Sequence, residues 1–319
     1  MSAAATAAPV AVLGAGTIGA GWAAFFALSG LQTRVYDTSP DAPAAVARMM
    51  DSARPVMQRL GRLSPHAYEP LVTQDIAQAV AGITHLQEAL PEQLELKREV
   101  YAQAEAHAPR EAIFASSSSG IRPSLLQESL AAPERLLVVH PCNPPYLMPL
   151  VEVVGGERTS PSTVQVARAL YEALGKKVIV MRREITGHLV NRLQAALWRE
   201  AVHLAAEGVV SVEDVDQAVT AGLGTRWAVC GPHEIFHLSG GDAGMQGFLD
   251  RLGPAVEQWW ADLGTPVLDE RTRQVLVKGM QDAARGRTPA FMATERDRRL
   301  LDMLEAQKQS KQQSQLKAD

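Results

Sequence analysis

Three short segments of the sequence concentrate side chains that can do chemistry. They are a run of four serines at residues 116–119, the segment HPCNPPYLMPLVE at residues 140–152, and GHLVNRL at residues 187–193. An imidazole such as that of His140 exchanges a proton near neutral pH, and a carboxylate such as Glu152 can orient it. Serine hydroxyls and the amide of Asn191 can hold an oxygen that changes between alcohol and ketone.

The elements around these segments alternate between strands and helices in the first half of the chain. Apolar runs predict strands at residues 9–13, 33–36, 84–89, 112–115, 136–139, 150–154 and 177–181, and helices at 42–60, 92–107 and 161–174. Such alternation predicts a doubly wound parallel sheet. His140 and the serine run then follow strands at their carboxyl ends, where these sheets bind ligands.

A dinucleotide-binding turn is predicted where the first strand meets the first helix. Gly14, Gly16 and Gly19 form G-x-G-x-x-G there, and Thr17 and Ile18 open the helix. The first two glycines allow a tight turn and the approach of a pyrophosphate, and the third allows close helix packing. The start of the helix offers free N–H groups to the phosphates.

Asp37 predicts which dinucleotide binds. It follows the second strand, where its carboxylate can accept hydrogen bonds from both ribose hydroxyls. The same carboxylate would repel a 2′-phosphate, and the next residues, Thr38 and Ser39, provide no guanidinium to bind one. We therefore predict NAD rather than NADP.

From Gly187 onward the apolar periodicity becomes helical, with glycine and proline at the joins. The predicted fold class is α/β, with an N-terminal Rossmann sheet over residues 1–186 and an all-α substrate and dimerisation domain over residues 187–319. Apolar helices without a sheet usually pack on one another or on a second subunit, so we expect a homodimer. The Ala-rich start and the Gln- and Lys-rich end at 307–319 are expected to be loose.

The chain resembles the 3-hydroxyacyl-CoA dehydrogenase superfamily over nearly its whole length. The resemblance rests on H-P-x-N-P with a glutamate twelve residues after the histidine, the serine run, V-N-R-L, and GLGTRWAVCGPHEIFHL at residues 222–238. The motifs are most similar to the lambda-crystallin or L-gulonate 3-dehydrogenase branch, and L-carnitine dehydrogenase is a near relative. A non-catalytic, crystallin-like NAD-binding protein is disfavoured because the catalytic residue types are all present.

The resemblance implies a role for each residue of the site. His140 is the base, Glu152 is its partner, and Ser119 and Asn191 hydrogen-bond to the reacting oxygen. From the residues alone, the register within the four serines stays open, and Asn191 also suits the cap of a helix that starts near Gly187.

Three further residues are implied to contact the cofactor. They are Glu92, Lys97 and Asn143, which spacing alone does not select. A start of an exposed helix with ordinary charges is the alternative for Glu92 and Lys97.

The substrate expected from the motifs is a small 3-hydroxy acid resembling L-gulonate. Its carboxylate requires a cation, and Arg226 is the first candidate before Arg122 and Arg192. An acyl-CoA substrate is the first alternative, although residues 40–65 contain no lysine to hold the CoA phosphates. L-Carnitine is the second, and its quaternary ammonium calls for aromatic or acidic surroundings; Tyr146, Trp198 and Trp227 are the aromatic candidates.

Composition and charge narrow the class of protein. A net charge of −4 and a pI near 6.1 give no basic field for nucleic acid or an anionic membrane. No apolar run approaches the length of a membrane span, and we expect no signal peptide in the first residues, which lack basic side chains and a long apolar core. Two cysteines, Cys142 and Cys230, fit a reducing cytoplasm. The histidine and cysteine spacings predict no metal site.

Overall fold

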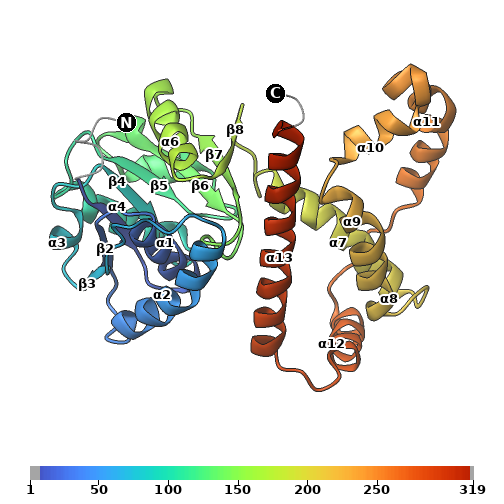
Figure 1. Cartoon of the computed structure of the whole chain (residues 1–319), viewed down its shortest axis with the longest axis horizontal. Coiled ribbons are helices and arrows are strands. Elements are labelled where there is room, and N and C mark those ends of the chain that lie inside the picture. The colour runs from blue at the N-terminus through green and yellow to red at the C-terminus, as the bar shows by residue number, and fades with distance from the viewer. Residues whose placement is uncertain (1–7, 317–319) are drawn as a thin grey trace. The chain divides into compact units, whose positions relative to one another are not determined.

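The computed structural model describes residues 8–316, and the internal contacts divide the chain into two compact units (Figure 1). The first unit comprises Met1–Asn191 and Thr294–Asp319, and the second comprises Arg192–Ala293. The expected Rossmann sheet lies in the first unit, and the described residues of the second unit contain helices but no strand. The predicted fold class, a Rossmann sheet followed by a helical part, is confirmed.

Within residues 8–316, eight strands form one sheet in the order β3-β2-β1-β4-β5-β6-β7-β8. Their bounds are β1 Val10–Leu13, β2 Thr33–Tyr36, β3 Leu71–Thr73, β4 His85–Glu88, β5 Ile113–Ser116, β6 Leu136–Pro141, β7 Leu150–Gly155 and β8 Lys177–Met181. Neighbours from β3 to β6 are parallel, in the order of a dinucleotide-binding sheet. This order places the glycine turn after β1 next to the end of β4.

The sheet departs from the parallel arrangement at β7. This strand pairs antiparallel with β6, and β8 then pairs parallel with β7. The reason is the short connection between β6 and β7, residues 142–149, because a parallel pair needs a crossover of a dozen residues or more. The antiparallel pairing sets which residues of β6 and β7 lie opposite each other, and these two strands carry His140 and Glu152.

Helices cover both faces of the sheet. The helices of this unit before α7 are α1 Thr17–Leu28, α2 Ala42–Arg59, α3 Ile76–Val80, α4 Leu94–Glu105, α5 Pro123–Leu126 and α6 Pro161–Ala173. Buried side chains of α1, α2 and α6 form one core cluster, and those of α3, α4 and α5 form the other. Three of these elements were not predicted from the sequence: β3, α3 and α5, which are only three, five and four residues long.

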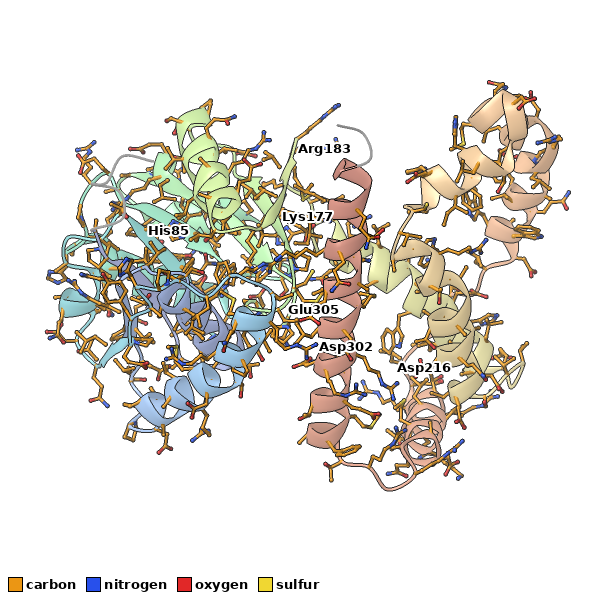
Figure 2. The ribbon with its side chains drawn as sticks, in the orientation of Figure 1. His85, Lys177, Arg183, Asp216, Asp302 and Glu305 are labelled. Atoms are coloured by element: carbon orange, nitrogen blue, oxygen red, sulfur yellow. The ribbon has the colours of Figure 1, made fainter. Side chains whose placement is uncertain are left out.

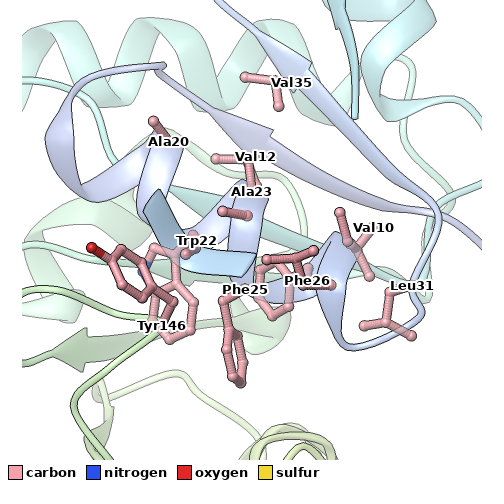
Figure 3. Close-up of a cluster of buried hydrophobic side chains, with 14 of the residues drawn as sticks. Val10, Val12, Ala20, Trp22, Ala23, Phe25, Phe26, Leu31, Val35 and Tyr146 are labelled. Carbon is pink, nitrogen blue, oxygen red and sulfur yellow. The ribbon is translucent and has the colours of Figure 1, made fainter. Parts of the chain in front are cut away.

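The first helix, α1, is buried along most of its length. Trp22, Phe25 and Phe26 are fully buried, and Trp22 stacks on Phe26 with ring centroids 5.2 Å apart. Figure 3 shows these rings beside Tyr146, which comes from the loop after β6. Burial of three aromatic side chains anchors the helix whose first turn follows the glycines.

The second unit consists of helices in its described residues. They are α7 Val190–Ala206, which begins in the first unit, α8 Val212–Gln217, the π-helical turn η3 Ala218–Leu223, α9 Gly224–Trp227, α10 Pro232–Ser239, α11 Gly244–Asp262 and α12 Glu270–Ala284. Many of their large apolar side chains are exposed.

The last helix, α13 Pro289–Leu316, joins the first unit from residue 294 onward. Leu301 enters the core, Arg59 of α2 pairs with Asp302 and Glu305, and Lys308 donates to the Leu60 carbonyl (Figure 2). The expected single domain over 187–319 is therefore not the compact unit that the contacts define. The expected loose end continues α13 as far as Leu316; residues 317–319 and the Ala-rich residues 1–7 lie outside the described part.

The loop at residues 142–149 is held against α1 by a glycine and a lysine. A Cβ on Gly21 would come within 2.8 Å of Pro145, so the absence of a side chain lets the loop approach the helix. The Lys176 ammonium donates to the carbonyl oxygens of Pro145 and Met148, the latter at 2.8 Å. The loop that connects His140 to Glu152 is thus fixed at its backbone.

Lys176 has an unusual environment for a lysine. It is 4% exposed, and its ammonium lies 4.2 Å from the centre of the Phe25 ring. Burial, with repulsion from Arg62, lowers the pKa of Lys176 to about 7. The amine is therefore only partly charged at neutral pH.

Replacing Lys176 with methionine should change how stability depends on pH. The unfolded chain keeps this proton up to a pKa of 10.5, whereas the folded chain releases it near 7, so unfolding takes up a proton between these values. The free energy of unfolding of wild type should therefore rise relative to Lys176→Met as the pH increases from about 7 to about 9. Urea titrations at several pH values measure this difference.

An exposed lysine of the second unit provides the control for that experiment. The side chain of Lys278 is 77% exposed, so Lys278→Met should show no comparable trend. A stability difference between wild type and Lys176→Met that stays constant with pH would contradict the burial argument.

Candidate active site

The structure brings His140 and Glu152 together as cross-strand neighbours. The register of β6 and β7 sets the two residues opposite each other, and His140 Nδ1 lies 2.7 Å from Glu152 Oε2. Their exposed fractions are 6% and 1%. The twelve-residue spacing in the sequence thus corresponds to direct pairing across an antiparallel ladder.

The second oxygen of Glu152 is held by backbone at the start of α7. Oε1 accepts hydrogen bonds from the N–H groups of Leu189 at 2.7 Å and Val190 at 3.0 Å. Burial acts to raise the Glu152 pKa, but the hydrogen bonds from His140, Val190 and Leu189 outweigh it and hold the pKa below its ordinary value.

The charge on Glu152 decides the tautomer of His140. An ionised carboxylate can only accept, so Nδ1 of the ring carries the hydrogen. Nε2 is then left with a free lone pair that can take a proton from a substrate hydroxyl.

Two of the four serines are used inside the sheet. The Ser116 hydroxyl donates to Glu88 at 2.6 Å. The Ser117 hydroxyl accepts from the indole N–H of Trp22 at 3.1 Å and from Gln87 at 2.7 Å. Both side chains therefore fix the turn rather than face a ligand.

The other two serines differ from each other. The Ser118 hydroxyl donates to Glu92 at 2.5 Å. Ser119 is exposed, and among residues 8–316 its hydroxyl has no hydrogen-bond partner, while its carbonyl accepts from the side chain of Asn191 at 3.1 Å. Among the four serines, Ser119 therefore has the hydroxyl available to a ligand, and its contact with the reacting oxygen stays a prediction.

The glycine turn has the shape that a dinucleotide requires. Gly14 has φ +96°, and a Cβ there would lie 2.8 Å from the Ala89 carbonyl oxygen. A Cβ on Gly19 would lie 1.9 Å from the carbonyl oxygen of Gly14, whereas one on Gly16 would meet no atom within 4 Å. Gly14 and Gly19 are thus required for packing, and Gly16 leaves open space in front of the turn.

The residues around the turn suit NAD. α1 begins at Thr17, followed by Ile18, and its N-cap provides no side-chain hydrogen bond, so the first N–H groups stay available to phosphate oxygens. Asp37 follows β2 and accepts from the N–H groups of Ala15 at 2.6 Å and Ser39 at 2.8 Å. Its carboxylate is thereby held beside the turn.

The other predicted ligand-binding residues lie in different settings. Glu92 is exposed beside the serine turn and accepts from Ser118 and the Gly120 N–H. Lys97 is 1% exposed and pairs with Glu88 at 2.5 Å, so this lysine has a structural partner that the sequence analysis missed.

The other two residues predicted to contact a ligand lie elsewhere in the chain. Asn143 is exposed in the loop after His140. Arg226 is exposed on α9 in the second unit. Their ligand contacts stay predictions.

A second histidine beside the site was not among the residues predicted from the sequence. His188 is fully buried two residues before α7, and its ring centroid lies 5.3 Å from that of His140. Its only signal in the sequence is a histidine inside GHLVNRL, a motif chosen for Asn191. Within the described part of the chain, no group of three or more metal-ligating side chains converges, and no helix is both long and apolar enough to cross a membrane.

Comparison with known families identifies the chain. Residues 9–185 match the family model "3-hydroxyacyl-CoA dehydrogenase, NAD binding domain", and residues 187–264 match "3-hydroxyacyl-CoA dehydrogenase, C-terminal domain". The chain belongs to the 3-hydroxyacyl-CoA dehydrogenase family. It is an NAD-dependent oxidoreductase that acts on a CH–OH group.

Individual relatives cover nearly the whole chain. L-Carnitine dehydrogenase of Streptomyces coelicolor is 45% identical over 93% of this chain and 94% of its own length. L-Carnitine dehydrogenase of Pseudomonas putida is 40% identical over 94% of each chain. The solved structure of 5-formyl-3-hydroxy-2-methylpyridine 4-carboxylic acid 5-dehydrogenase, an NAD+-dependent dismutase, is 31% identical with a TM-score of 0.81, covering 94% of this chain and 99% of the other.

These relatives favour the L-carnitine alternative over the L-gulonate expectation drawn from the motifs. The motifs include the cofactor turn and the His–Glu pair, which are predicted to serve the oxidation of a CH–OH group that the whole family shares.

Two alanine substitutions in the glycine turn should separate stability from cofactor binding. Gly16→Ala adds a methyl group where no protein atom lies within 4 Å, so the melting temperature should stay near wild type. The methyl group occupies the approach of the pyrophosphate, so NADH affinity should fall about tenfold or more. Thermal unfolding and a fluorescence titration with NADH measure the two effects.

Gly19→Ala is the matched variant. Its Cβ would lie 1.9 Å from a backbone oxygen, so the protein should lose about 1–3 kcal/mol of stability as well as NADH affinity. Full NADH affinity in Gly16→Ala would show that this turn is not the cofactor site.

Proposed function

We propose that this protein oxidises the 3-hydroxyl of L-carnitine to the 3-keto acid with NAD, using His140 as the base. Two observations support the two parts of the proposal. The 2.7 Å contact of His140 with Glu152 carries the chemistry. Relatives named L-carnitine dehydrogenase, up to 45% identical over 93% of the chain, support the substrate.

The residues divide the reaction between them. His140 Nε2 takes the hydroxyl proton while the electron pair of the C3–H bond leaves carbon. Bound NAD would accept the C3 hydrogen together with this electron pair, as a hydride. Glu152, on the other side of the ring, stabilises the imidazolium. Ser119 and Asn191 hydrogen-bond to the oxygen as the alcohol becomes a ketone. Because both donors are neutral, they can bind the alcohol and the ketone without strongly favouring one of them.

The aromatic candidates for the quaternary ammonium differ in exposure. Tyr146 is 6% exposed in the first unit, whereas Trp198 and Trp227 of the second unit are 52% and 40% exposed. L-Gulonate and a 3-hydroxyacyl-CoA stay as alternative substrates.

A substrate panel tests the proposal directly. The purified protein is incubated with NAD and L-carnitine, L-gulonate or L-3-hydroxybutyryl-CoA, and NADH absorbance is followed. We expect the highest kcat/KM for L-carnitine. A higher value for either other compound would replace the proposed substrate, and no NADH with any of the three would contradict the proposal.

His140→Gln in the same assay tests the mechanism. The variant keeps a hydrogen-bonding side chain but cannot take the proton, so kcat should fall roughly 10²-fold or more. NADH affinity should stay near wild type because the glycine turn is unchanged. Near-normal kcat would show that another group is the base.

We also propose a homodimer that forms through the helices of the second unit. Several of its large apolar side chains are more than half exposed: Trp198, Val229, Leu238, Trp259, Trp260 and Val267. Monomeric proteins rarely expose so many, and a second subunit would cover them.

We also propose a reducing compartment such as the cytoplasm for this protein. Cys142 and Cys230 are both free thiols, which supports it.

The molar mass in solution tests the dimer. Light scattering coupled to gel filtration should give twice the 34.3 kDa of the chain. A mass of one chain across the micromolar range would contradict the proposed assembly without bearing on the chemistry of the site.

A further inference from the structure

His188 occupies a position that costs free energy to maintain. Its backbone is left-handed, with φ +49°, and its side chain is fully buried. Such a φ is uncommon for a residue other than glycine and persists only where surrounding contacts require it. His188 immediately precedes the two N–H groups that bind Glu152.

The hydrogen bond of the ring fixes its tautomer. His188 Nε2 lies 2.9 Å from the carbonyl oxygen of Ser118. A carbonyl can only accept, so Nε2 carries the hydrogen and Nδ1 holds a lone pair. Nδ1 is buried and has no hydrogen-bond partner among residues 8–316.

Burial keeps the His188 ring neutral. The titratable groups that face it are His140 on β6, Glu152 on β7 and Glu92 after β4. Burial is the largest effect and lowers the pKa of His188, and His140 lowers it further; the hydrogen bond to Ser118 and the two carboxylates act to raise the pKa but do not outweigh burial. A neutral ring beside His140 adds no positive charge that would oppose protonation of the base.

The two histidines therefore differ in whether a ring nitrogen can accept a proton from a substrate. His140 has a carboxylate partner at Nδ1 that leaves Nε2 as the acceptor. The only free lone pair of His188 is enclosed by protein. His188 is thus unsuited to be the base, although it stands beside it.

Four consecutive residues at the start of α7 bind both parts of the site. His188 holds the Ser118 carbonyl, the N–H groups of Leu189 and Val190 hold Glu152, and Asn191 holds the Ser119 carbonyl. Of these residues, His188 is the one whose ring both donates to the serine turn and lies beside the ring of His140, with ring centroids 5.3 Å apart.

We propose that His188 is a positioning residue: its Nε2–H fixes the Ser118 carbonyl and so sets the Ser119 hydroxyl in place relative to His140. The catalytic consequence rests on the proposed roles of His140 and Ser119. The structural consequence, that the ring holds the serine turn, is independent of those roles.

Two variants of the same position separate the donor from the ring. His188→Phe keeps the ring but removes the Nε2–H, whereas His188→Gln places an amide N–H near the same point. Neither residue is branched at Cβ, so both meet a similar backbone cost at φ +49°. His188→Asn, which tolerates this φ well but is too short to reach Ser118, replaces the Phe variant if that variant does not fold.

The first readout needs neither substrate nor cofactor. Amide hydrogen exchange over residues 116–121 should be faster in His188→Phe than in wild type, and His188→Gln should restore most of the protection. Equal protection in all three proteins would overturn the proposal, whatever the enzyme's substrate.

The second readout is kinetic. His188→Phe should lower kcat about 10- to 100-fold, since displacement of a positioned group by about 1 Å has an effect of this order. NADH affinity and the midpoint of the acidic limb of kcat/KM should stay near wild type, and His188→Gln should recover most of kcat. A full kcat in His188→Phe, or a loss in both variants that follows NADH affinity and melting temperature, would overturn the positioning role.

His140→Gln, run beside them, separates this inference from the proposed function. An active His140→Gln would remove the base assignment and leave the exchange result to stand on its own. An inactive His140→Gln with a fully active His188→Phe would overturn only the role of His188.

Discussion

The antiparallel pairing of β6 with β7 sets His140 opposite Glu152, and the chemistry of the site depends on that register. A slip of one residue would move the carboxylate to the other face of the sheet and leave the imidazole without its partner. The register is stabilised on both sides. The neighbouring strand residues are fully buried, and the loop between the strands is held to α1 by Lys176.

A buried carboxylate is costly unless its oxygens are satisfied, and Glu152 shows how the fold meets that requirement. One oxygen binds His140 and the other binds the first N–H groups of α7. Because these groups favour the charged form, the carboxylate can in turn stabilise a positive imidazole. The start of α7 therefore contributes to the electrostatics of the proposed base as well as to the architecture.

The serine turn follows the same principle with neutral groups. Three of its hydroxyls make hydrogen bonds to the core or to Glu92, and its carbonyls at 118 and 119 are bound by the residues before and at the start of α7. Such a turn has few conformations left to adopt. The hydroxyl of Ser119 is thereby oriented by contacts that its own side chain does not make.

Local sequence patterns determined much of this protein, because strand and helix periods, the glycine turn and the end of β2 depend on neighbouring residues. They predicted the positions of most strands, the glycine turn at Gly14, Gly16 and Gly19, Asp37 after the second strand, and a histidine and a glutamate that lie in contact in the structure. Tertiary structure decided what depends on distant residues. The free hydroxyl of Ser119 among four serines, the burial of His188 and the packing of α13 on the first unit all arise from contacts between segments far apart in the chain, which no local period encodes. The antiparallel direction of β7 is a separate case, because it follows from the length of the connection after β6 and not from an apolar period.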